Sequence, residues 1–265
     1  MATMEPPERS VGDLEADSAA ALAGLRDLAR IPFLPRQWQP ADVATAYRVQ
    51  RQARLLSGSA IAGYKVGMTN QAVQQANGLA EPIAGWLSPA SVLRIGSIIR
   101  SAARRLRLVE SEVIFQMASD LPPVGVRYSR DTVSRAVAAA YAGLEVCDSR
   151  FIDLDAQPAV NVIADNSNAS LLVVGSQLPA LVGPLDVTLS CGSATPVSGS
   201  TATVLGDPLL SLCWLANWLN DRGGALLAGQ YVASGTCTGV SVAGPNDHCA
   251  ARFGADAAVE CYFVP

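Results

Sequence analysis

Histidine is almost absent from this sequence, since His248 is the only one among 265 residues. A zinc site built from several histidines is therefore excluded, and little scope remains for a Ser-His-Asp triad, which uses histidine as its base. The cysteines include no CxxC pair, which removes the usual paired-cysteine metal and redox motifs. Any chemistry must therefore run on carboxylates, lysine, hydroxyls and backbone groups.

Charge and long apolar runs are also scarce. Only 16% of the residues are charged and the net charge is −4, so the chain has no basic face for nucleic acid. No apolar run is long enough to span a bilayer, and the N-terminus lacks the basic and apolar regions of a signal peptide. We therefore expect a cytoplasmic protein with reduced thiols at all six cysteines. These are Cys147, Cys191, Cys213, Cys237, Cys249 and Cys261.

Half of the residues are hydrophobic, which is enough for one large domain or for a small unit packed on a larger one. We expect the first 15 or so residues to be disordered. Helical spacing follows over 16–30 and again over 41–56, where Gly58 ends the pattern. The sequence thus predicts a helical N-terminal segment over 1–60 and a catalytic domain over 61–265.

Short strands and Gly-rich turns fill most of the remainder. A capped helix is predicted to begin at Asp207, with Pro208 in its first turn. The Ala-rich stretch 131–142 is predicted to be helical, and 161–168 to be a strand end that turns into a polar loop. Because few helices separate the strands, the pattern favours an α+β fold with antiparallel or mixed sheets over a doubly wound sheet.

Three glutamates lie in apolar, strand-like surroundings. Glu110 and Glu112 are two residues apart, so a strand places both on one face, and Glu145 lies between Leu144 and Val146. Ionised carboxylates are costly to bury unless something compensates them, and one hard divalent cation could compensate all three. The alternative is that these side chains alternate outward into water. Spacing alone leaves both interpretations open.

Six segments, in order, resemble the 2-oxopent-4-enoate hydratase and 2-oxohex-3-enedioate decarboxylase group of the fumarylacetoacetase superfamily, which acts in the breakdown of aromatic compounds. The resemblance covers most of the chain, from about Ala41 to Phe263. Its segments are GYKVGMT (63–69), VESEV (109–113), LEVCDSR (144–150), IADNS (163–167), LGDPL (205–209) and SGTCTG (234–239).

The resemblance implies a mixed β-roll body (fumarylacetoacetase C-terminal-like) behind a small helical N-terminal part, and a homo-oligomer. It implies that Glu110, Glu112 and Glu145 bind Mg²⁺ or Mn²⁺, and that the partner is a small-molecule 2-oxo acid. It makes Lys65 the catalytic acid/base or charge-stabilising group. A lysine on a core strand near a cation should have a lowered pKa. The alternative for Lys65 is a snorkelling or salt-bridged lysine.

The same resemblance assigns substrate binding to two further segments. Asp165, Asn166 and Ser167 would orient the ligands and hold the substrate carboxylate. Without the resemblance, these three would be interpreted as simple turn residues. Thr236 would line the pocket, with a plain turn residue as the alternative.

One departure from the family pattern bears on the reaction. Many hydratases of the group carry an acidic residue at the position of Ile83 in the segment EPIAGWL (81–87). An apolar side chain cannot position water or relay a proton, so ordinary pentadienoate hydration is put in doubt. Ile83 and Trp86 would then form pocket wall, which fits decarboxylation or a larger, more apolar substrate.

Three functions remain open, and the first is preferred. It is a hydratase-like lyase that acts on a 2-oxo or 2-hydroxy-dienoate through a metal-stabilised dienolate. The second is a 2-oxohex-3-enedioate (4-oxalocrotonate) decarboxylase, which needs a cation for the distal carboxylate, such as Arg104, Arg105 or Arg107. The third is a non-catalytic family member, and the three glutamates with Lys65 argue against it.

Overall fold

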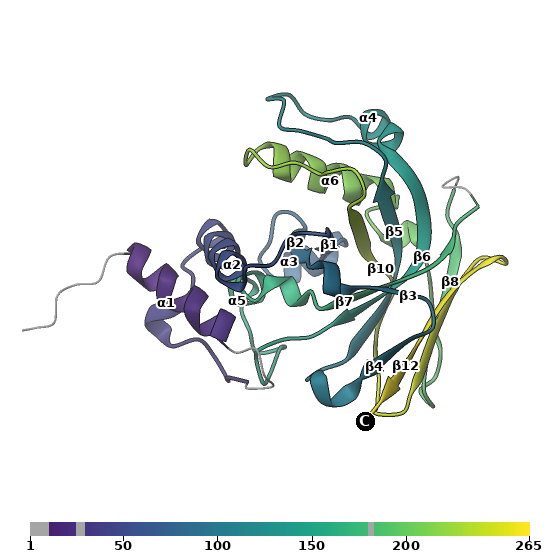
Figure 1. Ribbon diagram of the computed structural model, residues 1–265, viewed down its shortest axis with the longest axis horizontal. Helices are drawn as coiled ribbons and strands as arrows, with labels where there is room; N and C mark the ends of the chain where they lie inside the picture. The colour runs from purple at the N-terminus through teal and green to yellow at the C-terminus, as the bar shows by residue number, and fades with distance from the viewer. Residues whose placement is uncertain (1–10, 25–29, 180–182) are drawn as a thin grey trace, which may run out of the picture. The chain divides into compact units, whose positions relative to one another are not determined.

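The computed structural model describes residues 11–24, 30–179 and 183–265 (Figure 1). The chain forms two compact units. The first contains the described residues up to Ser59 together with Arg150–Asp165, and the second contains Ala60–Ser149 and Asn166–Pro265. Our division at residue 60 assigned 150–165 to the catalytic part and stays a prediction. Among the described residues, no helix is long and apolar enough to cross a membrane.

The first unit is helical. Its helices are α1 (Val11–Gly24), the 3₁₀ turn η1 (Arg36–Trp38), α2 (Val43–Ser57) and α5 (Ala159–Ala164). Asp42 caps α2 by accepting a hydrogen bond from the Thr45 N–H. The helix ends at Gly58, as the sequence predicted, and this glycine is in the left-handed conformation. Helix α1 already includes residues 11–15, which we expected to be disordered, whereas 25–29 lie outside the described residues.

The segment Arg150–Asp165 of this unit begins and ends on one ion pair. The backbone N–H of Arg150 donates to Asp165 Oδ2 over 2.8 Å, and its guanidinium donates to Oδ1 over 2.6 Å. Helix α5 lies between Arg150 and Asp165 in the sequence. We predicted that the chain from residue 161 is the end of a strand, and that prediction is wrong. Pro158 sets the first turn of this helix, and its six residues are too few for periodicity to distinguish a helix from a strand.

The second unit contains two mixed sheets (Figure 1). The seven-stranded sheet has the order β2-β1-β10-β5-β6-β7-β3, and the five-stranded sheet has the order β4-β12-β11-β8-β9. The β1–β10, β3–β7 and β4–β12 pairs are parallel and the rest are antiparallel. This confirms the predicted α+β fold with a mixed β-roll body. The strands are β1 (Gly63–Gly67), β2 (Ile83–Leu87), β3 (Val92–Arg94), β4 (Ser97–Arg100), β5 (Leu108–Met117), β6 (Val137–Cys147), β7 (Leu171–Gln177), β8 (Asp186–Cys191), β9 (Val197–Ser200), β10 (Tyr231–Val242), β11 (His248–Phe253) and β12 (Ala257–Val264).

The seven-stranded sheet has two different faces. One face joins the five-stranded sheet in the main hydrophobic core, to which β5 contributes Val109, Val113 and Phe115. The sheets approach closely at Gly175, where a Cβ atom would lie 2.5 Å from the Cβ of Val259. Because strand residues alternate between faces, the even-numbered residues of β5 lie on the opposite face. This second face carries a smaller apolar cluster that includes Ile114.

Strand β6 begins inside a stretch that we predicted to be helical. Only α4 (Arg130–Arg135) is helical there, and the residues from Val137 pair with β5 instead. Pairing with strands on both sides and burial outweigh the helix propensity of alanine. Gly143 permits this pairing, because a Cβ atom at that position would lie 2.1 Å from Ile114 Cδ1. The prediction of a helix over 131–142 is therefore wrong beyond its first turns.

Besides α4, the second unit contains the α-helices α3 and α6. The short helix α3 (Gln71–Ala76) is capped by Asn70, and the long helix α6 (Pro208–Asn220) begins at its predicted cap. Asp207 Oδ1 accepts a hydrogen bond from the Leu209 N–H over 2.9 Å. The buried side of α6, which includes Leu212 and Leu215, belongs to the main core.

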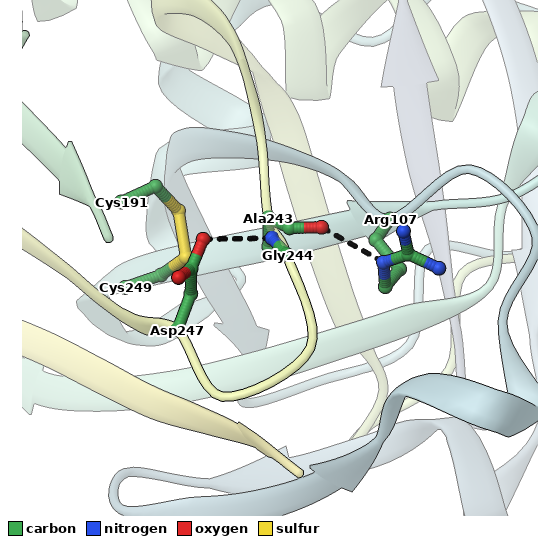
Figure 2. The surroundings of a disulfide bond; sticks show 6 residues. All are labelled: Arg107, Cys191, Ala243, Gly244, Asp247 and Cys249. Carbon is green, nitrogen blue, oxygen red and sulfur yellow. Dashed lines mark hydrogen bonds between the residues drawn. A yellow bond between two sulfur atoms is a disulfide. The ribbon is translucent and has the colours of Figure 1, made fainter. Parts of the chain in front are cut away.

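A disulfide joins two strands of the five-stranded sheet. Cys191 of β8 lies directly opposite Cys249 of β11, and their sulfurs are bonded (Figure 2). The expectation of six reduced thiols is therefore wrong for this pair, while the other four cysteines are free. The partners are 58 residues apart, and only strand register brings them together. Beside them, Arg107 donates to the carbonyl of Ala243, as Figure 2 also shows.

Candidate metal centre

The three glutamates lie on two neighbouring central strands. Glu110 of β5 is directly opposite Glu145 of β6. Glu112 is opposite Gly143 of β6 and, on its other side, Thr236 of β10. All three therefore lie on the face that points away from the main core, as the two-residue spacing predicted for Glu110 and Glu112.

Burial excludes the water-facing interpretation for two of these side chains. Glu112 is 1% exposed and Glu145 is 0% exposed, so neither extends into water. Lys65 of β1 is 4% exposed, and its Nζ lies 3.3 Å from Glu145 Oε2. The cluster therefore holds three carboxylates, including the half-buried Glu110, and one ammonium group.

The pKa values of the two fully buried glutamates are raised, mainly by burial. Burial raises the pKa of Glu112 well above its ordinary value, and repulsion from Glu145 and Glu110 raises it further. Burial also raises the pKa of Glu145, although the neighbouring Lys65 partly offsets this. Without a cation, the ionised forms of Glu112 and Glu145 are therefore less favourable than those of ordinary glutamates.

Lys65 departs from the lowered pKa that we expected. Burial by itself lowers the pKa of Lys65, but attraction to Glu145, Cys147, Glu110 and Glu112 outweighs burial and raises the value overall. The expectation assumed a bound cation that neutralises the carboxylates. Without a metal ion, Lys65 is a salt-bridged lysine, which was our alternative interpretation.

The carboxylate oxygens of the cluster fit a hard divalent cation. Among the described residues, neither carboxylate oxygen of Glu145 accepts a hydrogen bond of ordinary geometry, although both are buried. Such oxygens are costly unless a cation compensates them. Glu110, Glu145 and Cys147 offer ligand atoms that lie within 4.8 Å of one another. Sequence reasoning missed Cys147, although its place two residues after Glu145 on the same strand puts it on the same face.

Glu112 is oriented by a glycine of β10. The backbone N–H of Gly235 donates to Glu112 Oε2 over 2.9 Å. Gly235 has a φ of 112°, and a Cβ atom there would lie 2.2 Å from Thr69 Oγ1. Only glycine fits this position. The neighbouring Thr236 accepts a hydrogen bond from the Gly239 N–H and donates to the Gly239 carbonyl, so its hydroxyl closes a local turn opposite Glu112.

The Lys65 amine and the Ile83 side chain both lie close to Gly67. A Cβ atom on Gly67 would lie 3.2 Å from Lys65 Nζ and 3.4 Å from Ile83 Cγ1. Gly67 and Ile83 are directly paired in the β1–β2 ladder, and Ile83 is buried. The lysine amine and the apolar side chain of Ile83 therefore both lie close to Gly67.

The predicted substrate-binding turn is bonded to β2. Asn166 accepts from the Trp86 N–H and donates to the Trp86 carbonyl, both over 2.9 Å, and Ser167 donates to the Ala84 carbonyl over 2.8 Å. These side chains thus hold the strand that carries Ile83 and Trp86, and their contact with substrate stays a prediction. Asp165 belongs to the first unit, where its carboxylate binds Arg150.

Comparison with known proteins identifies the family. No family model matches the chain. A curated 2-keto-4-pentenoate hydratase of Burkholderia vietnamiensis (strain G4 / LMG 22486) is 32% identical over 202 residues, which cover 73% of this chain and 76% of the relative. The chain belongs to the 2-keto-4-pentenoate hydratase family. This confirms the resemblance drawn from the six sequence segments.

Decarboxylases are similar to this hydratase-family chain as well. A 4-oxalocrotonate decarboxylase of Pseudomonas sp. (strain CF600) is 27% identical over 246 residues, which cover 90% of this chain and 92% of the relative. A solved structure of 4-oxalocrotonate decarboxylase from Pseudomonas putida G7, complexed with magnesium and adipate, has the same fold. It superposes with a TM-score of 0.87 at 24% identity and covers 98% of this chain and 100% of that one.

Proposed function

We propose that the protein is a divalent-metal-dependent lyase that acts on a 2-oxo or 2-hydroxy-dienoate, in the manner of a 2-keto-4-pentenoate hydratase. The observation that carries this proposal is the buried set of Glu112 and Glu145 with Glu110 beside them and Lys65 in ion-pair contact. A protein without catalytic function has no need for three carboxylates that converge around one lysine. Similarity to curated hydratases supports the same reaction class.

Glu110, Glu112 and Glu145 would hold Mg²⁺ or Mn²⁺, since such cations take carboxylate oxygens. A solved decarboxylase of the same fold carries magnesium, which supports this choice of metal. When bound, the cation supplies positive charge where negative charge develops on the 2-oxo end of the substrate. The Gly235 N–H keeps Glu112 in one orientation for this task.

Lys65 would hold or move the proton at the substrate carbon. Its amine is buried, so no bulk water competes for the proton, and Glu145 fixes its position at 3.3 Å. Gly67 leaves the space beside this amine open, since any side chain there would fill it. Neutralisation of the glutamates would remove much of the attraction that raises the pKa of Lys65, which brings the amine closer to a useful proton donor and acceptor.

Decarboxylation of 2-oxohex-3-enedioate is the second candidate, and the position of Ile83 favours it. Ile83 lies close to Gly67, as the lysine amine does, and an isoleucine cannot activate water, whereas loss of CO₂ requires no added water. This reaction needs a cation for the distal carboxylate. Of the three candidate arginines, Arg107 donates to the carbonyls of Ala243 and Arg104, whereas Arg104 has a buried Nε without a partner among the described residues.

One experiment separates these reactions. The Mg²⁺-loaded protein is incubated with 2-hydroxypenta-2,4-dienoate and, separately, with 2-oxohex-3-enedioate, while absorbance and released CO₂ are followed. Consumption of the first without CO₂ supports the hydratase, and CO₂ from the second supports the decarboxylase. If neither is consumed, both reactions are wrong. The Glu110→Gln variant is the control, and if it equals the wild type, the metal mechanism is wrong.

We further propose that the protein is a cytoplasmic homo-oligomer in the breakdown of aromatic compounds. Light scattering coupled to size-exclusion chromatography tests the oligomer, and a monomeric mass would contradict it. The disulfide between Cys191 and Cys249 is unusual for a reducing compartment. Trapping of free thiols in freshly broken cells tests whether this disulfide exists there.

A further inference from the structure

Cys147 adds a sulfur atom to the glutamate cluster. It follows Glu145 by two residues on β6, so both side chains lie on the same face of the sheet. The thiol is buried, and its Sγ lies 3.5 Å from Glu110 Oε2, to which it donates. Cys147, Glu110 and Glu145 each offer one ligand atom, and these three atoms lie within 4.8 Å of one another.

We propose that Cys147 is a sulfur ligand of the metal centre and gives it a preference for thiophilic divalent cations over Mg²⁺. This inference rests on the proposed metal centre and specifies its chemistry further. On binding, the Sγ–H proton leaves to solvent and the sulfur lone pair is donated to the cation. No electron is transferred, so the step requires no oxidant or reductant.

The expected selectivity follows from ligand softness. Mg²⁺ takes hard oxygen ligands, which the glutamates supply with or without sulfur. Thiolate sulfur favours softer ions such as Zn²⁺ and Cd²⁺, and cysteine ligands are typical of zinc sites. Removal of the sulfur should therefore weaken Cd²⁺ binding and leave Mg²⁺ binding nearly unchanged. A thiol that only donates a hydrogen bond to Glu110 predicts no such difference between the two ions.

The chain provides a matched control for this thiol. Cys237 of β10 is also free and buried, but it belongs to the main core on the other face of the sheet. Cys237→Ala thus removes a thiol of similar burial without touching the cluster. Cys147→Ser keeps a hydrogen-bond donor for Glu110, and Cys147→Ala serves if the serine variant does not fold.

The full-length protein is titrated with CdCl₂ and, separately, with MgCl₂. Near-ultraviolet absorbance reports sulfur-to-cadmium charge transfer, and calorimetry reports both affinities. We expect one equivalent of Cd²⁺ to produce the band in the wild type and in Cys237→Ala but not in Cys147→Ser. Cd²⁺ affinity should fall at least about tenfold in Cys147→Ser, because even the loss of a residue that only supports a metal ligand typically lowers metal affinity by that factor. Mg²⁺ affinity should stay within about threefold, since magnesium sites use oxygen ligands.

An unchanged band in Cys147→Ser, or an unchanged ratio of Cd²⁺ to Mg²⁺ affinity, would overturn the inference. Failure of the metal centre itself gives a different result. In that case neither ion binds the wild type with defined stoichiometry, and Glu110→Gln changes nothing. If Mg²⁺ binds the wild type but not Glu110→Gln, and the cadmium band is independent of Cys147, only the role of the sulfur is wrong.

Discussion

Glu112 and Glu145 are buried carboxyl groups whose pKa values lie above the ordinary glutamate value of 4.5 in the absence of a cation. The folded state thus retains protons that the unfolded state releases above this pH. Because the folded state binds more protons, the free energy of unfolding of the metal-free protein should fall as pH rises above 4.5. Lys65, whose pKa is raised, adds to the fall only above its ordinary value of 10.5.

Thermal unfolding between pH 5 and pH 8, with a chelator or with Mn²⁺, checks this pH dependence. The melting temperature should decline with pH in the chelator and decline less with Mn²⁺, since the cation stabilises the ionised carboxylates. Glu112→Gln should flatten the decline in the chelator, because it removes one buried titrating group. Equal slopes in the wild type and in Glu112→Gln would contradict the burial of this charge.

Lys65→Met separates a catalytic lysine from one that merely supports the glutamates. We expect turnover to fall by about 10²–10⁴-fold, the usual contribution of a positioned acid or base. Mn²⁺ affinity should stay the same or increase, because a positive charge 3.3 Å from Glu145 opposes a second cation. Calorimetry measures the affinity. Loss of Mn²⁺ binding in parallel with activity would show that Lys65 acts by holding the ligands in place.

The sequence could predict which face the glutamates share but not what surrounds them. Alternation along β5 placed Glu110 and Glu112 together. The pairing of Glu110 with Glu145 depends instead on the register between β5 and β6, which brings together two residues 35 positions apart in the sequence. Cys147 was missed because an isolated cysteine in an apolar strand is usually plain core. The raised pKa of Lys65 was missed because it depends on the summed field of four neighbours.

At the scale of single elements, the irregular part of β10 has the strictest requirement for one residue type. Gly235 combines a φ of 112° with a close approach to Thr69, so alanine meets both strain and a clash. Gly229, with a φ of 82° and nothing within 4 Å of an added Cβ atom, is the matched control for the strain alone. Gly235→Ala should destabilise the fold by about 1–3 kcal/mol more than Gly229→Ala, which is the usual cost of overpacking.

Urea unfolding measures this difference, and calorimetry with Mn²⁺ measures its effect on the metal centre. Because the Gly235 N–H orients Glu112, Gly235→Ala should also weaken Mn²⁺ binding, whereas Gly229→Ala should not. If the two variants are equally stable and bind Mn²⁺ equally, the close approach of Gly235 to Thr69 does not exist in solution.

The disulfide between β8 and β11 closes a loop of 58 residues. Chain-entropy arguments assign about 4 kcal/mol to a loop of that length. Cys249→Ser should therefore lower the free energy of unfolding by an amount of this order, and dithiothreitol should destabilise the wild type but not the variant. Cys213→Ser, which changes a free cysteine of α6, is the control. Equal stability of wild type with and without reductant would show that the bond is not formed.

Element prediction succeeded where local chemistry decides and failed where pairing decides. The cap Asp207 and the stop at Gly58 each gave one helix end correctly, because each acts through its own backbone neighbours. The alanines of β6 were misassigned, since only contact with β5 and β7 makes that stretch a strand.

On the scale of the whole molecule, the helical unit includes a segment, Arg150–Asp165, that is far from its other residues in the sequence. Residues 150–165 depend on the N-terminal residues, since Ile31 pairs with Phe151 and Gln50 donates to the Ile163 carbonyl over 2.8 Å. A chain of 60–265 would therefore expose Phe151 and Ile163, both fully buried now. No local pattern in the sequence reports this pairing, which is why we placed the boundary at residue 60.

Truncation tests this dependence. Expression of 60–265 should give a protein that aggregates or melts well below the full chain, because apolar surface that is now buried meets water. A second truncation that also replaces 150–165 with a short Gly-Ser linker should recover solubility. If 60–265 alone is as soluble and as stable as the full chain, the boundary predicted from the sequence is sufficient.

All three glutamates lie on one antiparallel pair, β5 and β6, in the middle of the seven-stranded sheet, whereas Ile83 and Trp86 lie on β2 at its edge. An edge strand can be exchanged with little disturbance to the ladder beyond its single neighbour, β1. The metal ligands and the edge strand can thus change independently in evolution. Descendants of one ancestor could retain the ligands on β5 and β6 while the sequence of β2 diverges. Chimaeras that differ only in 81–91 would be the smallest genetic change by which such a lineage could pass from one reaction to another.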